Sequence, residues 1–181
     1  MYQPKIYKDT NGDRQVVASG GTLLAQSGAA VDLSAATVTL PETQIRYAEI
    51  TVTNAEMLAL RATPKTLVAA AGAGKTLEFI SAVLIFDYTG AYTESADNLV
   101  VRYATTTGAK ASSDIESTGF VDATADTLTT TVAIKDAIVA KAVADNTPLV
   151  LHNIGDGELG GGNAANLIRV KVAYRVHTNG W

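Results

Sequence analysis

The sequence contains no cysteine, and charged residues make up only 18% of it. The absence of cysteine excludes disulfide bonds and thiolate chemistry. It does not indicate a compartment, because cytosolic proteins and virion proteins can both lack cysteine. Since charged residues usually make up about a quarter of a protein, their scarcity here predicts a surface covered by Thr, Ser, Asn, Gly and Ala. Such surfaces are common in subunits that pack into assemblies, although secreted β-proteins share them.

The sequence also lacks a long hydrophobic run. The longest, ISAVLIF at 80–86, has seven residues, whereas a membrane-spanning helix needs about 20. The first residues, MYQPKIYKDTNGD, are polar and do not resemble a signal peptide. We therefore expect a soluble protein that is made in the cytosol and has no membrane partner.

No basic stretch is present, and the net charge is −4 with a pI of about 5.1. This charge balance argues against a nucleic-acid partner. The 181 residues, 47% of them hydrophobic, are enough to bury a core without metals or disulfide bonds. They suit one sizeable domain, or a domain with an arm.

What the sequence does contain is short runs of Val, Ile, Thr and Tyr, bounded by Gly, Asn and Asp. Residues 45–53 and 167–178 alternate strictly between apolar and polar side chains, which is typical of half-exposed antiparallel strands. Residues 76–90 are long enough to form a central strand, and 118–134 predict two strands or one bent pair. About eight strands follow residue 45, with no crossover helices between them. The sequence predicts an all-β, antiparallel β-sandwich of the jelly-roll type over 45–181.

Helical signals are few. The segment TNAEMLAL at 53–60 begins with a Thr-Asn cap and predicts one or two helical turns. In IKDAIVAKAVAD at 134–145, Ile134, Ile138 and Ala142 have helical spacing and predict a short helix. Neither segment is long enough to form a layer of helices.

Residues 1–44 are rich in glycine and differ from the rest. They repeat a faint period of eight, SGGTLLAQ followed by SGAAVDLS. Two such copies cannot bury a core alone. We therefore expect an extended N-terminal arm that lies on the domain, on a neighbouring subunit or on a larger surface.

The segment AAAGAGKT at 69–76 is close to a nucleotide-binding P-loop, since it ends in Gly74-Lys75-Thr76. The motif requires glycine where Ala69 stands, and it requires a helix after the loop. The residues that follow predict a strand instead. We interpret the segment as a hairpin turn in which Gly72 and Gly74 supply positive φ angles.

Other candidate sites are weak. GDGELGGGN at 155–163 and DTNGD at 9–13 hold possible calcium ligands, but a mobile loop and an Asn-Gly hairpin turn explain them better. His152 and His177 lie in predicted strands, where a hydrogen-bonded or exposed histidine is the ordinary outcome. Tyr88 and Tyr92 either cover the end of the sandwich, which we favour, or contact a sugar or protein. No cofactor, metal site or catalytic set of residues is expected.

Three parts of the chain resemble small structural proteins of tailed-phage heads. The first has Lys5 to Tyr7, Gly12-Asp13 and Val16 to Gly21 in the matching order; the others are 59–79 and 117–127. The resemblance implies a capsid decoration (cement) protein with a jelly-roll body and an arm. It implies a place in the virion on the capsid surface, and it carries no catalytic residues.

The expected function is therefore stabilisation of an icosahedral capsid by binding between capsomers. The expected partners are the major capsid protein and further copies of the chain, as a dimer or trimer. The arm residues expected to make contacts are Tyr2, Ile6, Tyr7, Val16 and Val17. One alternative is a sandwich on a phage tail or fibre that binds a receptor or carbohydrate through loops 88–92 and 155–162. A cytosolic enzyme is disfavoured, because no nucleophile–base pattern is present.

Overall fold

The computed structural model forms two compact units, each of which is described by itself. The first unit comprises residues 1–39 and the second 40–181. The structure describes the following residues of the chain: 6–8, 15–17, 44–93, 98–135 and 138–179.

The first unit contains one antiparallel pair of short strands, β1 (Ile6–Lys8) and β2 (Gln15–Val17). The pairing agrees with the hairpin expected around Asn11-Gly12, although that turn itself lies outside the described residues. The eight-residue period expected within 18–43 lies outside them as well.

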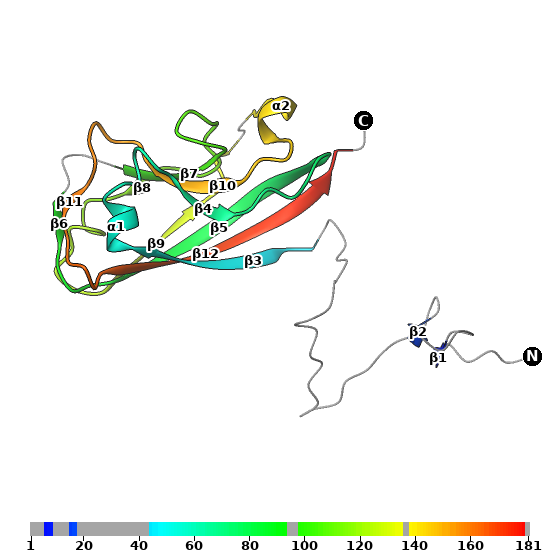
Figure 1. Cartoon of the computed structure of the whole chain (residues 1–181), viewed down its shortest axis with the longest axis horizontal. Helices are drawn as coiled ribbons and strands as arrows, with labels where there is room; N and C mark the ends of the chain where they lie inside the picture. The colour runs from blue at the N-terminus through cyan, green and yellow to red at the C-terminus, as the bar shows by residue number, and fades with distance from the viewer. Residues whose placement is uncertain (1–5, 9–14, 18–43, 94–97, 136–137, 180–181) are drawn as a thin grey trace, which may run out of the picture. The chain divides into compact units, whose positions relative to one another are not determined.

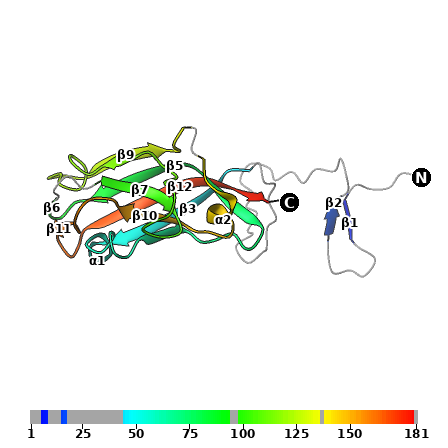
Figure 2. The ribbon, with the colours of Figure 1, turned by 90° about the horizontal axis from the view of Figure 1, so that it is seen from above.

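The second unit is a sandwich of two four-stranded antiparallel sheets (Figure 1). Its main strands are β3 (Arg46–Thr53), β4 (Lys65–Val68), β5 (Lys75–Asp87), β7 (Asn98–Tyr103), β8 (Ile115–Glu116), β9 (Thr127–Val132), β10 (Leu149–Asn153) and β12 (Leu167–Thr178). A two-stranded ribbon of β6 (Tyr92–Thr93) and β11 (Gly160–Gly161) lies at one end of the sandwich (Figure 2).

The strand order is that of a jelly roll. One sheet has the order β3-β12-β5-β9 and the other β4-β10-β7-β8. Numbered one to eight along the chain, the main strands therefore form a 1-8-3-6 sheet and a 2-7-4-5 sheet. Eight antiparallel strands folded between two sheets in this way make a jelly roll. The expected all-β sandwich is confirmed.

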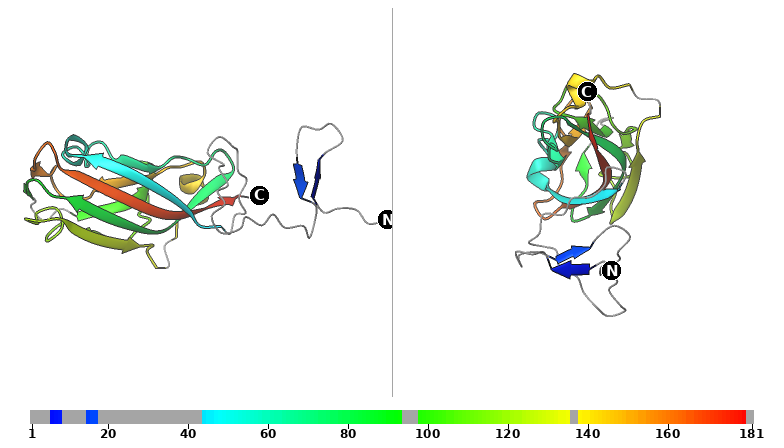
Figure 3. Two further views of the ribbon diagram at one scale, coloured as in Figure 1. Left: turned by 90° about the horizontal axis from the view of Figure 1, so that it is seen from below. Right: turned by 90° about the vertical axis from the view of Figure 1, so that its right-hand side faces the viewer.

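The first sheet follows the period-two pattern of the sequence. Along β3 and most of β12, apolar side chains face the second sheet and polar ones face outward. The 13-residue β5 pairs with β12 on one side and β9 on the other, as expected for a central strand. A bulge between Ala173 and Tyr174 shifts the register of β12 against β5. Such bulges increase the local twist, and the long strands of this sheet are visibly twisted (Figure 3).

The second sheet departs from that pattern, because β10 and nearly all of β7 are buried on both faces. Leu99, Val101 and Leu151 point into the core between the sheets. On the opposite face, Arg102 and His152 are also buried, which shows that connecting segments cover this side. A polar cavity lies there.

The helices are short. α1 (Asn54–Met57) begins after Thr53, whose side chain forms a capping box with Glu56, so the predicted cap is confirmed. α2 (Lys141–Ala144) is much shorter than the helix expected over 134–145. The predicted short helix therefore forms only at the end of the segment. The face expected from Ile134, Ile138 and Ala142 is not buried, because Ile138 is 97% exposed and Ala142 is also exposed. Within the described residues, no helix has the length and apolar character to cross a membrane.

Two further predictions need correction. The segment 118–134 contains one strand, β9, because residues 118–122 form a turn in which Phe120 and Val121 donate to the carbonyl oxygen of Ser117. The segment 69–76 is not a hairpin turn, since β4 and β5 belong to different sheets. It is a connection from one sheet to the other, and Gly72 and Gly74 do have positive φ angles of 102° and 71°.

Candidate functional site

The candidate site lies on the outer face of the second sheet, where β7 and β10 pair. Val150 is the register partner of Arg102, and His152 is that of Val100. Arg102 and His152 are therefore diagonal neighbours on one face, a spacing that long side chains can bridge. The register of the two strands thus brings a guanidinium and an imidazole together.

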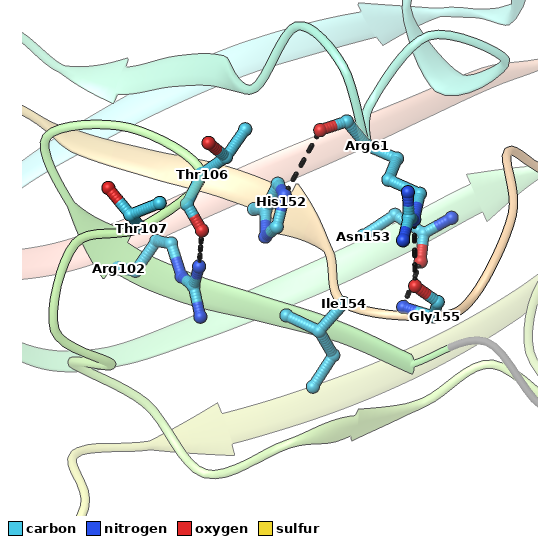
Figure 4. Close-up of a pocket in the computed structure, with 8 residues that line it drawn as sticks. All are labelled: Arg61, Arg102, Thr106, Thr107, His152, Asn153, Ile154 and Gly155. Atoms are coloured by element: carbon cyan, nitrogen blue, oxygen red, sulfur yellow. Dashed lines mark hydrogen bonds between the residues drawn. The ribbon is translucent and has the colours of Figure 1, made fainter.

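A cavity of about 410 Å³ opens at this place (Figure 4). Its walls come from β7, β10, the segment that follows each of these strands, and the β3–β4 connection. The lining residues are Arg61, Arg102, Thr106, Thr107, His152, Asn153, Ile154 and Gly155. A volume of this size accommodates a small organic ligand.

Arg102 forms one wall and is only 9% exposed. Its Nη1 donates to the carbonyl oxygen of Thr106, and its Nε has no partner. Burial lowers the pKa of the guanidinium, and the negative charge of Asp114 opposes that shift. Because an arginine side chain does not lose its proton in proteins, Arg102 places a nearly buried positive charge in the cavity.

His152 is 6% exposed, and its Nε2 lies 3.1 Å from the carbonyl oxygen of Arg61. Since a carbonyl oxygen only accepts, Nε2 carries the hydrogen, and in the neutral ring Nδ1 is a free acceptor. Nδ1 has no partner. Burial, and then the positive charge of Arg102, lower the pKa of His152. The ring is therefore neutral at pH 7.

Arg61 is held at the rim by contacts distant in sequence. Its backbone amide donates to Oε2 of Glu158 at 2.9 Å, and Ala62 donates to Oε1 of the same carboxylate at 2.8 Å. Its Nε donates to the carbonyl oxygen of Gly155 at 2.8 Å. Gly155 is itself placed by Asn153, whose side-chain oxygen accepts from its amide at 2.7 Å.

The cavity is therefore electropositive in a protein of net charge −4. Of the described carboxylates that act on the cavity, Asp114 attracts Arg102, and both oxygens of Glu158 are already engaged by backbone amides. Within the described parts of the chain, no cluster of three His, Cys, Asp or Glu side chains is placed to hold a metal ion. The arrangement suits binding of an anion or a polar ligand.

The predicted arm residues are partly brought together. In the β1–β2 pair, Ile6 is the register partner of Val17 and Tyr7 that of Val16. Tyr2 lies outside the described residues. Val17 is 41% exposed within its unit. Four of the five expected contact residues thus lie on one two-stranded element.

The two loops of the alternative receptor site do meet. β6 and β11 pair with each other. In this pair Thr93 lies opposite Gly160, and Tyr92 lies opposite Gly161. Tyr92 is buried, and its ring contacts that of Phe86 at 5.7 Å between centroids, so the expected role in covering the sandwich end is confirmed. The segment 155–163 is not the mobile loop predicted, because β11 and Glu158 anchor it to the fold.

Both histidines prove to be hydrogen-bonded strand residues, as expected. His177 lies on β12, with its Nε2 2.8 Å from Oε2 of Glu78 on β5. Arg175 donates to the same oxygen at 3.3 Å. Burial acts to raise the pKa of Glu78, but the hydrogen bonds from His177 and Arg175 outweigh it and hold the pKa below its usual value. This cluster is an ion-pair group across the β5–β12 ladder.

The P-loop-like segment has no phosphate-binding geometry. Lys75 is exposed at the start of β5, and a strand rather than a helix follows. The amide of Gly72 donates to the side-chain oxygen of Asn146, 3.0 Å away, so one loop amide is already used. The strand expected after this segment is confirmed.

Sequence reasoning missed the cavity residues Arg61, Arg102, Thr106 and Thr107. One signal was available in the sequence. Arg102 stands between the apolar run LVV at 99–101 and Tyr103, in a segment rich in strand-forming residues. A charged residue at such a position needs a partner or a cavity.

In comparisons with known proteins, no family model, no curated protein and no solved structure matches the chain. The site is therefore interpreted from its own chemistry.

Proposed function

We propose that the protein is a non-enzymatic structural subunit of a tailed-phage virion. In this role it decorates the outer surface of the capsid and stabilises it by binding between capsomers, with the major capsid protein and further copies of the chain as partners. The proposal rests on the resemblance carried by the N-terminal and central motifs. The structural observation that supports it best is a set of three large apolar side chains exposed on one sheet face of the jelly-roll body.

That face is the outer side of the β3-β12-β5-β9 sheet. Tyr47 on β3 is 78% exposed, and Leu128 and Val132 on β9 are 61% and 60% exposed. Register places Leu128 beside Ile85 and Val132 beside Ser81 on β5. Exposing large apolar side chains on a sheet face is costly in water, and covering them with a neighbouring subunit is favourable.

The same sheet presents a free edge. β3 is an edge strand of eight residues, RYAEITVT, and its charged residues are Arg46 and Glu49. It contains no Pro or Lys, two residues that often protect edges from pairing with other chains. An extended segment of a neighbour, such as an N-terminal arm with its β1–β2 pair, adds to such an edge through backbone hydrogen bonds.

The physical mechanism is linkage. A subunit that binds the assembled shell and not the free capsomers shifts the disassembly equilibrium toward the shell. Burying three large apolar side chains contributes about 1.5–3 kcal/mol each when burial is complete. Many weakly attached copies then stabilise a capsid without any chemical reaction.

The test is binding of purified protein to undecorated heads of its own phage. A variant carrying Tyr47→Ser, Leu128→Ser and Val132→Ser should bind at least about 100-fold more weakly, because it removes the apolar contacts. Ile138→Ser is the matched control, since Ile138 is 97% exposed but lies outside this face. Equal binding by the triple variant and the control contradicts the proposed interface.

The arm is tested separately by deleting residues 1–44. We expect the shortened protein to fold and to lose most of its capsid affinity, as measured by sedimentation with heads. Unchanged affinity contradicts a role for the arm and leaves the sheet face as the contact. Electron microscopy of whole virions would locate the protein on the head or elsewhere.

A second function is favoured by a different observation, the electropositive cavity around Arg102 and His152. A tail- or fibre-associated sandwich that binds a host receptor or carbohydrate would use such a cavity. Density at the tail rather than on the head, together with specific binding on a glycan array, would favour this function over capsid decoration.

A further inference from the structure

We propose that the cavity between β7 and β10 binds a small carboxylate that carries a neighbouring hydroxyl group. Arg102 and Arg61 hold the carboxylate, and His152 accepts a hydrogen bond from the hydroxyl. This inference deepens the second candidate function by naming the ligand class. Its chemistry does not depend on where the protein lies in a virion, so its test uses the purified protein alone.

The first argument is uncompensated charge. Neither Arg61 nor Arg102 forms an ion pair with any described carboxylate. Asp114 attracts Arg102 only through space, and Glu158 is engaged by backbone amides. A nearly buried guanidinium without a counter-ion is unfavourable, and a bound carboxylate offsets that cost. Arginine suits this role because its planar fork matches a carboxylate.

The second argument concerns His152. Its Nδ1 is an acceptor without a partner, and Nε of Arg102 is a donor without one. A ligand hydroxyl donates a hydrogen to Nδ1 and keeps lone pairs for a donor. The pair of unsatisfied groups therefore favours a ligand that carries a hydroxyl group beside its carboxylate.

The third argument is the shape and lining of the cavity (Figure 4). Its volume of about 410 Å³ is large enough for one monosaccharide unit. Among the described residues that line the cavity there is no aromatic ring, so these residues supply selectivity through charge and hydrogen bonds. The hydroxyl groups of Thr106 and Thr107 lie at the same wall as Arg102. Two sources share this chemistry: a free hydroxy acid and a uronic acid unit of an acidic polysaccharide.

The experiment is calorimetric titration of the full chain at pH 7.5 with matched probes. Galacturonate is compared with galactose, which lacks the carboxylate, and lactate with propionate, which lacks the hydroxyl. We expect each first member to bind at least about 10-fold more tightly than its counterpart, as one additional hydrogen bond to a buried group provides. If galacturonate binds more tightly than lactate, the ligand is a uronic acid unit. If galacturonate and lactate bind with equal affinity, the ligand is a free hydroxy acid.

Three results overturn the proposal. They are galactose binding as tightly as galacturonate, propionate binding as tightly as lactate, and inorganic phosphate displacing both carboxylates at lower concentration. The proposal is also overturned if neither galacturonate nor lactate gives binding heat at up to roughly 10 mM, because so low an affinity does not indicate a specific binding site.

Variants assign the roles. Arg61→Gln should weaken galacturonate binding about 10-fold or more, whereas Lys171→Gln, which removes a positive charge from the other sheet, should leave it unchanged. His152→Gln should bring the lactate-to-propionate affinity ratio close to one, which a merely structural role would not do. Circular dichroism confirms that each variant is folded before it is titrated. Equal loss in Arg61→Gln and Lys171→Gln contradicts the site.

Discussion

Glu158 accepts hydrogen bonds from the backbone amides of Arg61 and Ala62, at 2.9 and 2.8 Å, across almost 100 residues of chain. This one carboxylate joins the β10–β11 connection to the β3–β4 connection. The same contact places the carbonyl oxygen of Arg61 over His152. The geometry of the cavity therefore depends on a residue that does not line it.

Replacing Glu158 tests this dependence. Glu158→Ala leaves two backbone amides without their acceptor, and we expect the free energy of unfolding to fall by about 1–2 kcal/mol. Urea unfolding measures the change. Glu49→Gln is the matched control, because Glu49 forms only an exposed 3.6 Å pair with Lys171 and should change stability by less than about 0.5 kcal/mol. Similar losses in both variants would contradict the anchoring role.

A second contact joins the two sheets. The hydroxyl of Tyr103 on β7 donates to the carbonyl oxygen of Leu77 on β5 at 2.8 Å, in a buried position. Tyr103→Phe keeps the ring and removes this bond, so we expect a loss of about 0.5–1.5 kcal/mol in the free energy of unfolding. Tyr47→Phe is a fitting control, because Tyr47 is 78% exposed. If Tyr103→Phe leaves the free energy of unfolding unchanged, the hydrogen bond between the two sheets does not contribute to stability.

The sheet alternation could be predicted from sequence because it depends on local patterning. Residues 46–53 and 167–178 show period two where one face is core and the other is solvent. The cavity could not be predicted, because it depends on the register of β7 against β10. Arg102 and His152 are 50 positions apart, and only the pairing of Val150 with Arg102 makes them neighbours.

Two of the local predictions that needed correction have a common physical cause. In 69–76, Gly72 and Gly74 correctly indicate a turn, but a turn does not specify which sheet the next strand joins. In 134–145, the spacing of Ile134 and Ile138 permits a helix, but no neighbouring surface buries that side. Local patterns are decided by tertiary packing when the segment is short.

Gly108 illustrates a constraint of the fold on the cavity loop. A Cβ atom built there would overlap the carbonyl oxygen of Tyr103, whereas one built at Gly157 would meet nothing within 4 Å. Gly108→Ala should therefore lower the free energy of unfolding by about 1–3 kcal/mol or more. Gly157→Ala should be neutral or stabilising by up to about 1 kcal/mol, because it restricts the unfolded chain. Urea midpoints of the two variants give the comparison, and equal midpoints would contradict the steric account.

The pH dependence of stability follows from His152. Burial and the positive charge of Arg102 place the pKa of His152 below 6.5, its ordinary value. The unfolded chain therefore takes up a proton at higher pH than the folded chain does. The free energy of unfolding should therefore be highest above pH 6.5. It should fall as the pH drops through 6.5, and it should become constant again below the pKa of His152 in the folded chain.

The groups that face His152 are Arg102 on β7, Arg61 on the β3–β4 connection and Glu158 on the β10–β11 connection. Glu56 and Glu78 have pKa values below 4.5, so their stabilising effect is lost only in more acidic solution. We therefore expect urea unfolding to show decreasing stability from pH 7.5 to 5.5, and a smaller decrease in His152→Gln. NMR titration of the His152 ring measures the cause directly, and a midpoint at or above 6.5 would contradict both the burial argument and the predicted slope.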